Sequence, residues 1–144
     1  MIEPARDRDL PDVRKLLEQC KLPLEGVDDH VQTMLVAREG AQIVGTAALE
    51  LYPDGALLRS VAVHPRRQGS GLGRELTQAA LRLAATHETD AVFLLTTTAE
   101  GFFPKFGFEQ VTRDDVPVTV RASVEFQSAC PASAIVMRKR LRDG

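Results

Sequence analysis

The chain has 144 residues, of which 44% are hydrophobic and 26% charged, and its formal net charge is −2. This length predicts one domain, residues 1–144, with a core large enough to be stable without disulfides. The sequence shows no block of Lys and Arg, which argues against a nucleic-acid partner. Its apolar runs are far shorter than the ~20 residues of a membrane span, and no signal-peptide pattern opens the chain. We therefore expect a soluble, cytoplasmic protein with no membrane partner.

The residues that most often bind metals do not form a pattern here. Cys20 and Cys130 lie far apart and have neither a CxxC spacing nor a nearby pair of histidines. Asp28, Asp29 and His30 are adjacent, so their side chains diverge, and no second ligand cluster accompanies them. We therefore expect no metal.

The first half of the chain predicts a strand, a helix and a hairpin. Residues 1–4 form the short strand, and Asp7 or Asp9 caps a helix that has Pro11 in its first turn. The apolar face of this helix consists of Leu10, Val13, Leu16, Leu17 and Cys20. Two strands joined by a tight turn at Glu39-Gly40 follow, at residues 33–37 and 42–51.

The second half alternates strands and helices. A turn at Pro53-Asp54-Gly55 leads into it. A strand is predicted at residues 56–63, a helix at 72–85 and a buried strand at 91–95. A short helix at 98–105, a strand that starts at 107–108 and a last strand at 134–137 follow. Between the last two, residues 114–130 indicate a loop with short helices. Together these elements predict an α/β (α+β) fold.

The most informative stretch places three glycines between a buried strand and an amphipathic helix, from Val61 to Arg74. Glycine lets the backbone approach a ligand closely, and the first amides of a helix lack internal partners and favour an anion. The loop therefore predicts a cradle for a pyrophosphate, although a turn without a ligand is the alternative. A dinucleotide fingerprint is excluded because Arg74 stands where the third glycine is required. A Walker A loop is excluded because no Gly-Lys-Ser/Thr follows.

Gln68, Gly71 and Gly73 match the pattern Q/R-x-x-G-x-G/A after a strand that ends Val-His-Pro. A helix, a buried strand, a second helix and a closing Gly-Phe follow in order. Over residues 2–108, this arrangement resembles the GNAT superfamily of N-acetyltransferases. The resemblance implies a mixed, mostly antiparallel sheet that is splayed at its centre and flanked by helices, with acetyl-CoA as the cosubstrate.

The resemblance also implies where the coenzyme lies. Its pantetheine occupies the cleft between the strands at 57–63 and 91–95 and pairs with the backbone of Val61 and Val63, while the loop amides hold the pyrophosphate. Thr96 stands where the family often has Asn. The residues predicted to contact the coenzyme are Val61, Ala62, Val63, Gln68, Gly69, Ser70, Gly71, Leu72, Gly73, Thr96, Thr98 and Phe103.

The catalytic residues are harder to identify. Many members of the family carry a tyrosine near the coenzyme sulfur, whereas Phe103 occupies that position here. Either Ser133 or Thr98 donates a hydrogen bond to the leaving thiolate, or the thiolate leaves unassisted, or the protein binds acetyl-CoA without catalysis. We favour the second, because a thiol with a pKa of about 8.5 is a good leaving group. Glu50 is the candidate base, acting through water, and an ordinary strand-end charge is the alternative.

The acceptor site is predicted from charges beside the cleft. Arg59 lies within an apolar strand, where a charge is costly unless it is paired or belongs to a site. Its guanidinium suits a forked contact with a carboxylate, and an Arg extending from an exposed strand edge is the alternative. Glu25 and His30 lie in a loop that often closes over the acceptor in this family, although a solvated loop is the alternative. Arg121 belongs to a tail segment that forms another wall of the acceptor pocket. The predicted acceptor-binding residues are therefore Arg59, Glu25, His30 and Arg121.

Three segments are similar to small GNAT proteins of bacterial arsenic-resistance operons, at residues 56–61, 96–100 and 130–134. Relatives in that setting acetylate an amino-acid-like arsenical or the herbicide phosphinothricin. The sequence thus predicts an acetyl-CoA-dependent N-acetyltransferase that acts on the primary amine of a small amino-acid-like or arsenical acceptor. A non-catalytic acetyl-CoA-binding or interaction module is the alternative, and a homodimer is left open.

Overall fold

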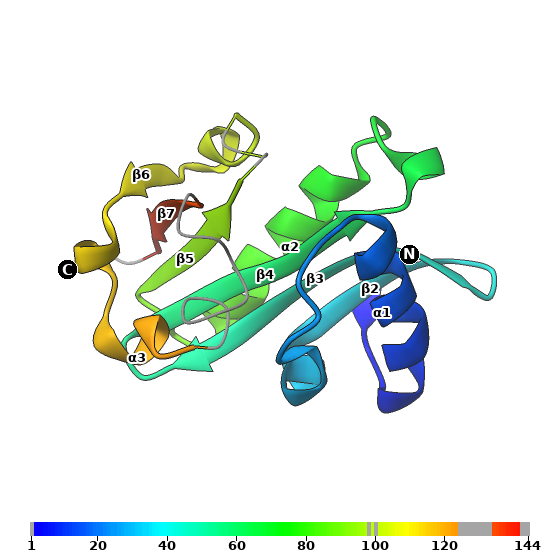
Figure 1. The fold of residues 1–144 in the computed structure, drawn as a ribbon, viewed down its shortest axis with the longest axis horizontal. Helices are drawn as coiled ribbons and strands as arrows, with labels where there is room; N and C mark the ends of the chain where they lie inside the picture. The colour runs from blue at the N-terminus through cyan, green and yellow to red at the C-terminus, as the bar shows by residue number, and fades with distance from the viewer. Residues whose placement is uncertain (1, 98, 100, 124–133, 142–144) are drawn as a thin grey trace.

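The computed structural model describes residues 2–97, 99, 101–123 and 134–141 (Figure 1). Within them, one sheet has the strand order β1-β2-β3-β4-β5-β7-β6, and every neighbouring pair is antiparallel except β4 and β5. The strands are β1 (Ile2–Pro4), β2 (Met34–Glu39), β3 (Gln42–Tyr52), β4 (Gly55–Val63), β5 (Ala91–Thr96), β6 (Glu109–Val111) and β7 (Ile135–Arg140). This mixed, mostly antiparallel sheet confirms the predicted fold class.

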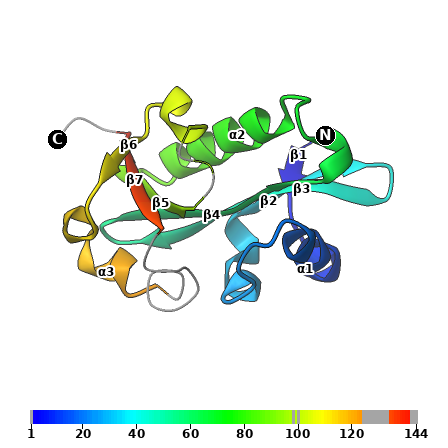
Figure 2. The same cartoon turned by 45° about the horizontal axis from the view of Figure 1, so that its top comes forward.

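Helices cover both faces of the sheet. Figure 2 shows α2 (Leu72–Thr86) on one face, and α1 (Leu10–Gln19) and α3 (Val118–Arg121) on the other. Short 3-10 turns connect the elements, at η1 (Asp7–Asp9), η2 (Val27–Thr33), η3 (Pro65–Arg67), η4 (Phe103–Phe106) and η5 (Arg113–Asp115). No helix in the described part of the chain is long and apolar enough to cross a membrane.

The two long helices bury the faces that their spacing predicts, with one difference. On α1, Val13, Leu16 and Leu17 are buried against β2 and β3. On α2, the buried apolar residues are Leu72, Leu76, Ala80 and Ala84, whereas the predicted Leu83 is only half-buried. These α2 positions repeat every four residues. Gly45 of β3 lets α2 come this close, because a Cβ there would lie 2.7 Å from the Leu76 side chain.

The predicted cap of the first helix is right in position, at Asp9, but wrong in its contact. The residue before α1 is Asp9, and its side chain does not cap the helix. Its carboxylate instead accepts hydrogen bonds from the Arg6 backbone N–H at 2.8 Å and from the Arg38 guanidinium at 2.6 Å. The hydrogen bond from Arg38 is the main reason that the pKa of Asp9 lies below its ordinary value. Asp9 therefore ties the start of α1 to β2.

The sheet opens between its two parallel strands. Only Ala56–Val92 and Leu57–Phe93 are paired between β4 and β5, although β4 continues to Val63. Beyond the paired residues, β4 is bulged against β3, and Ser60 in the bulge has a positive φ of 58°. A bulge bends its strand and increases the local twist. This geometry separates β4 from β5 and gives the splayed sheet that was predicted.

The C-terminal part of the sequence-based assignment needs correction. The helix expected over 98–105 is, among the described residues, only the turn η4, and residues 98 and 100 lie outside them. The following strand starts at Glu109, because Gly107 still has a turn conformation with a φ of 94°. The last strand, β7, starts at Ile135 and is longer than predicted.

Candidate functional site

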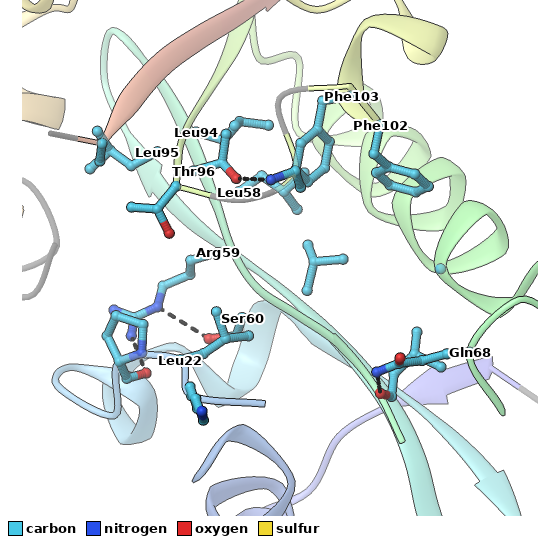
Figure 3. Close-up of a pocket in the computed structure, with 18 residues that line it drawn as sticks. Leu22, Leu58, Arg59, Ser60, Gln68, Leu94, Leu95, Thr96, Phe102 and Phe103 are labelled. Atoms are coloured by element: carbon cyan, nitrogen blue, oxygen red, sulfur yellow. Dashed lines mark hydrogen bonds between the residues drawn. The ribbon is translucent and has the colours of Figure 1, made fainter. Parts of the chain in front are cut away.

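A cavity of about 920 Å³ lies in the gap between β4 and β5. Figure 3 shows that Leu58, Arg59 and Ser60 of β4 line one side, while Leu94, Leu95 and Thr96 of β5 line another. Phe102 and Phe103 lie across from β4. The segment that follows α1 contributes Lys21, Leu22 and Pro23 to the wall. This volume lies in the range of cavities that enclose most of a drug-sized ligand. The fold thus places a large cavity where the sequence predicts the coenzyme.

The glycine loop lies at one end of this cavity, where Gln68 and Gly73 belong to its wall. Gly69 and Gly71 have φ angles of 81° and 90°, and an added Cβ at either residue would have no heavy atom within 4 Å. The space beside these two glycines is therefore open. Since α2 begins at Leu72, its first amides lack acceptors within the helix and are available to an anion. The loop fits a pyrophosphate.

The carbonyl of Val63 ends β4 beside this loop and already has protein donors. It accepts hydrogen bonds from Gln68 Nε2 at 3.1 Å and from Cys20 Sγ at 3.5 Å. Burial raises the pKa of the Cys20 thiol, which keeps the thiol protonated as a donor. Val61 and Val63 both line the cavity and are half-buried. Val61 and Val63 thus lie where the sequence predicted that the backbone of β4 pairs with pantetheine.

The other predicted coenzyme contacts divide into cavity residues and core residues. Thr96 and Phe103 line the cavity, and Thr96 Oγ1 accepts a hydrogen bond from the Ala99 amide at 2.9 Å. By contrast, Ala62 and Leu72 are buried in the core with 4% and 7% exposure, so only their backbone groups can serve a ligand. Among the loop residues, Gly69, Ser70 and Gly71 are exposed and lie outside the cavity wall. Thr98 lies outside the described residues.

A buried polar cluster adjoins the cavity through Arg59. The Arg59 guanidinium donates to Glu50 Oε2 at 2.8 Å, and the two side chains are only 1% and 2% exposed. Tyr52 donates its hydroxyl proton to the other Glu50 oxygen, and His30 Nε2 lies 3.5 Å from Oε2. Burial, and secondarily the hydrogen bond to Glu50, raise the pKa of the Tyr52 phenol well above its ordinary value. We call Glu50, Arg59, Tyr52 and His30 the Glu50 cluster.

The contacts within this cluster exclude the alternative roles that the sequence left open for Arg59 and for Glu50. Arg59 does not extend from an exposed strand edge, and Glu50 is not a solvated strand-end charge, because both are buried and paired. Glu50 and His30 do not line the cavity, whereas Arg59 does. The nitrogens of Arg59 also donate to Ser60 Oγ at 3.3 Å and to the Pro23 carbonyl at 3.4 Å.

The remaining predicted site residues lie elsewhere. Glu25 is exposed, and Arg121 is half-buried on α3; neither lines the cavity. Ser133 lies outside the described residues. In the described part of the chain, no three His, Cys, Asp or Glu side chains are grouped in a way that would hold a metal ion.

Sequence reasoning missed Lys21, Tyr52 and Ser60. Tyr52 had a usable signal, because residues two apart on a strand point to the same face and Tyr52 follows Glu50 at that spacing. Lys21 and Ser60 had none, since their left-handed backbone conformations, with φ of 58° each, are unusual for these residue types.

Comparison with known proteins is consistent with this geometry. The family described as Acetyltransferase (GNAT) domain matches residues 30–110, which is more than half of the chain. The amino-acid acetyltransferase of Mycobacterium tuberculosis is 31% identical over 129 residues, which cover 83% of this chain and 72% of that protein. The amino-acid acetyltransferase of Actinobacillus pleuropneumoniae serotype 3 is 29% identical over 120 residues. That match covers 80% of this chain, which spans only 28% of the Actinobacillus protein.

Solved structures show the same fold over almost the whole chain. Rv2747 from Mycobacterium tuberculosis, in complex with CoA and NLQ, superposes with a TM-score of 0.83 at 26% identity, covering 99% of both chains. The N-acetylglutamate synthase of Neisseria gonorrhoeae, complexed with coenzyme A and N-acetyl-glutamate, superposes with a TM-score of 0.84 at 23% identity. This chain covers 35% of that one. The chain therefore belongs to the GNAT acetyltransferase family, which confirms the family that the glycine loop predicted.

Proposed function

We propose that this protein transfers the acetyl group of acetyl-CoA to the amino group of a small amino-acid acceptor. The observation that carries the proposal is the cavity between β4 and β5, which has an open glycine loop at one end and the buried Arg59 on its wall. Acetyl-CoA is the cosubstrate that such a loop and cleft suit. The two relatives reported above, from Mycobacterium tuberculosis and Actinobacillus pleuropneumoniae, are named amino-acid acetyltransferases, which supports an amino acid as the acceptor.

The coenzyme would lie along β4. The amides at the start of α2 would hold the pyrophosphate, and the backbone of Val61 and Val63 would pair with the pantetheine. Gln68 would release the Val63 carbonyl as the pantetheine amide takes its place. The thioester would then lie near Phe103 and Thr96, towards the Arg59 end of the cavity.

The chemistry requires little from side chains. The neutral amine attacks the acetyl carbon, the C–S bond breaks, and the thiolate leaves with the charge on sulfur. No Asp, Glu or His is among the described residues that line the cavity, and in the proposed mechanism the proton of the amine passes to water. Because Glu50 is buried and bonded to Arg59 and Tyr52, we propose that it positions Arg59 rather than acting directly as a base.

The acceptor would place its carboxylate near Arg59. Each Arg59 nitrogen already donates to a protein group, so the fork contact that we expected from the sequence is restricted to the remaining N–H groups. An amino-acid-like arsenical carries the same amino and carboxyl groups and belongs to this acceptor class. The names of the two relatives described above support amino acids as acceptors and do not mention arsenicals.

A panel of matched acceptors tests the proposal through the release of free thiol from acetyl-CoA. L-glutamate, L-glutamine, phosphinothricin and an amino-acid-like arsenical all keep the α-amino acid group, whereas γ-aminobutyrate keeps the amine and loses the α-carboxylate. We expect turnover with at least one of the first four and none with γ-aminobutyrate. Tight acetyl-CoA binding without turnover of any amine would instead support the non-catalytic binding module.

A further inference from the structure

The end of helix α1 carries an unusual residue on the cavity wall. Lys21 lines the cavity and has a left-handed backbone conformation with a φ of 58°. The hydrogen bond from Leu22 N–H to the Leu17 carbonyl, at 3.0 Å, closes the helix in the Schellman manner. Glycine or asparagine usually occupies this position, because the left-handed conformation costs an L-residue with a Cβ about 1–2 kcal/mol. Strain of this kind is concentrated at functional sites.

The segment that carries Lys21 is fixed along β4. At one end, Cys20 contacts the Val63 carbonyl beside the glycine loop, and at the other, Pro23 accepts a hydrogen bond from Arg59. Lys21 therefore lies between the part of the cavity that suits phosphates and the part that suits the acceptor.

The charges of the cavity wall point to an anionic ligand. Lys21 and Arg59 are the only charged side chains among the described residues of this wall, and both are cationic. The charge of Arg59 is balanced by Glu50. By contrast, none of the ion pairs between described residues includes Lys21. Within the described part of the chain, the exposed Lys21 ammonium is thus the cation of the wall that no acidic side chain balances.

We propose that the Lys21 ammonium binds an anionic group of a ligand in this cavity, either the acceptor carboxylate or a phosphate of CoA. This inference rests on the proposed function, because it requires these two ligands. It assigns to Lys21 the charge recognition that Arg59, already paired with Glu50, provides only in part.

Three substitutions separate the charge of Lys21 from its backbone strain. Lys21→Gln removes the charge and keeps the strain, Lys21→Arg keeps both, and Lys21→Gly removes both. Glu88→Gly is the matched control, since Glu88 has a φ of 57° in the same motif at the end of α2, where Thr89 N–H bonds to the Ala84 carbonyl. Glu88 does not line the cavity. Lys21→Gly should lose binding, whereas Glu88→Gly should keep it.

Calorimetric titrations with CoA and with S-acetylpantetheine, and the KM at saturating acetyl-CoA for the acceptor of the panel that is turned over fastest, distinguish the two anions. We expect Lys21→Gln to weaken one ligand about three- to tenfold, as for a partly solvated charge pair, and we expect 0.5 M NaCl to remove most of this difference. Weaker CoA binding with unchanged S-acetylpantetheine binding assigns a phosphate. A raised KM with an unchanged CoA Kd assigns the acceptor carboxylate.

Two outcomes would overturn the inference. If Lys21→Gln binds CoA and uses the best acceptor of the panel as the wild type does, Lys21 recognises no anion. If the wild type itself binds no CoA, the proposed function fails first, and the two failures are therefore distinguishable.

Discussion

The Glu50 carboxylate and the Arg59 guanidinium form a hydrogen-bonded ion pair at 2.8 Å between adjacent strands, and both side chains are at least 98% buried. Arg59 is also part of the cavity wall, whereas Glu50 lies behind it. A charged group this deeply buried is stable only while its partner is present. The pair therefore couples the stability of the sheet to the shape of the cavity.

Removing one member of this pair should be costly. We expect Glu50→Ala to lower the free energy of unfolding by about 3–5 kcal/mol, because it leaves the Arg59 charge buried without its main partner. Urea denaturation at pH 7 measures this change. The double variant Glu50→Leu with Arg59→Met should lose less than the sum of the two single changes, since no buried charge is left. Strictly additive losses would show that the two groups are not coupled.

Tyr52→Phe tests whether the cluster positions Arg59 for the acceptor. The change removes one hydrogen bond to Glu50, so we expect a loss of about 1–2 kcal/mol in stability. We also expect a raised KM for the acceptor with an unchanged Kd for CoA, because the glycine loop lies at the other end of the cavity. Steady-state kinetics and calorimetry on the same preparation separate the two effects. Equal changes in both constants would mean that Tyr52 supports the whole cavity and not the acceptor end.

Much of this fold follows from local patterns. The turn residues around Gly40 and Gly55 and the spacing of Leu72, Leu76 and Ala80 predicted the hairpins and α2, because each signal acts within a few residues. The glycine loop could be placed for the same reason.

The buried cluster could not be predicted in this way. A charge within an apolar strand, such as Arg59, either extends to solvent or pairs with a residue on another strand. The choice depends on the pairing register of β3 and β4, in which Ala48 faces Arg59 on one side of a bulge at Ser60. A serine with a φ of 58° leaves no mark in the sequence that would locate such a bulge.

Gly71→Glu should abolish or greatly weaken CoA binding. The new side chain has room, since nothing lies within 4 Å of its Cβ, and it would place a negative charge where the pyrophosphate is proposed to lie. Gly40→Glu is the matched control, because Gly40 also has a positive φ and open space but belongs to the β2–β3 turn. Both variants should lose about 1–2 kcal/mol of stability to backbone strain. If calorimetry finds wild-type affinity in folded Gly71→Glu, the loop is not the phosphate site.

Asp9→Asn should make stability less dependent on pH in the acid range. The pKa of Asp9 is lowered in the folded state, so its carboxylate stabilises the fold above its unfolded pKa of about 3.9, and this stabilisation is lost as the pH falls through the folded pKa. We expect the wild type to be more stable by about 1–3 kcal/mol at pH 7, and the difference to shrink below about pH 4.

Unfolding midpoints between pH 3 and pH 7 measure this difference. Asp115→Asn is a suitable control. The pKa of Asp115 is also lowered, mainly by the hydrogen bond from the Thr112 amide. Unlike Asp9, however, Asp115 is exposed. A constant difference between wild type and Asp9→Asn across this range would contradict the role of the Asp9 charge.

Phe103→Tyr tests whether the thiolate leaves without a proton donor. Phe103 lines the cavity and is held by edge-on contacts with Phe102 and Phe108, at ring-centre distances of 5.1 and 5.8 Å. Under the proposed function, a hydroxyl on this ring would lie near the coenzyme sulfur, where charge develops, and only an interaction stronger in the transition state raises kcat. Positioned general acids contribute about 10²–10⁴-fold where the step needs them. We expect less than a tenfold gain, because a thiolate is a good leaving group.

The measurement is kcat for the best acceptor at saturating acetyl-CoA, together with the unfolding midpoint. Phe106→Tyr is the control, since Phe106 packs on Phe102 at 5.2 Å but does not line the cavity, so it reports the effect of an added hydroxyl on the aromatic group alone. A gain near a hundredfold would mean that protonation of the thiolate limits the natural enzyme. Loss of activity in a folded Phe103→Tyr protein would mean that the Phe103 ring itself packs against a substrate. Either result would contradict a mechanism that works by holding an amine against an unassisted thioester.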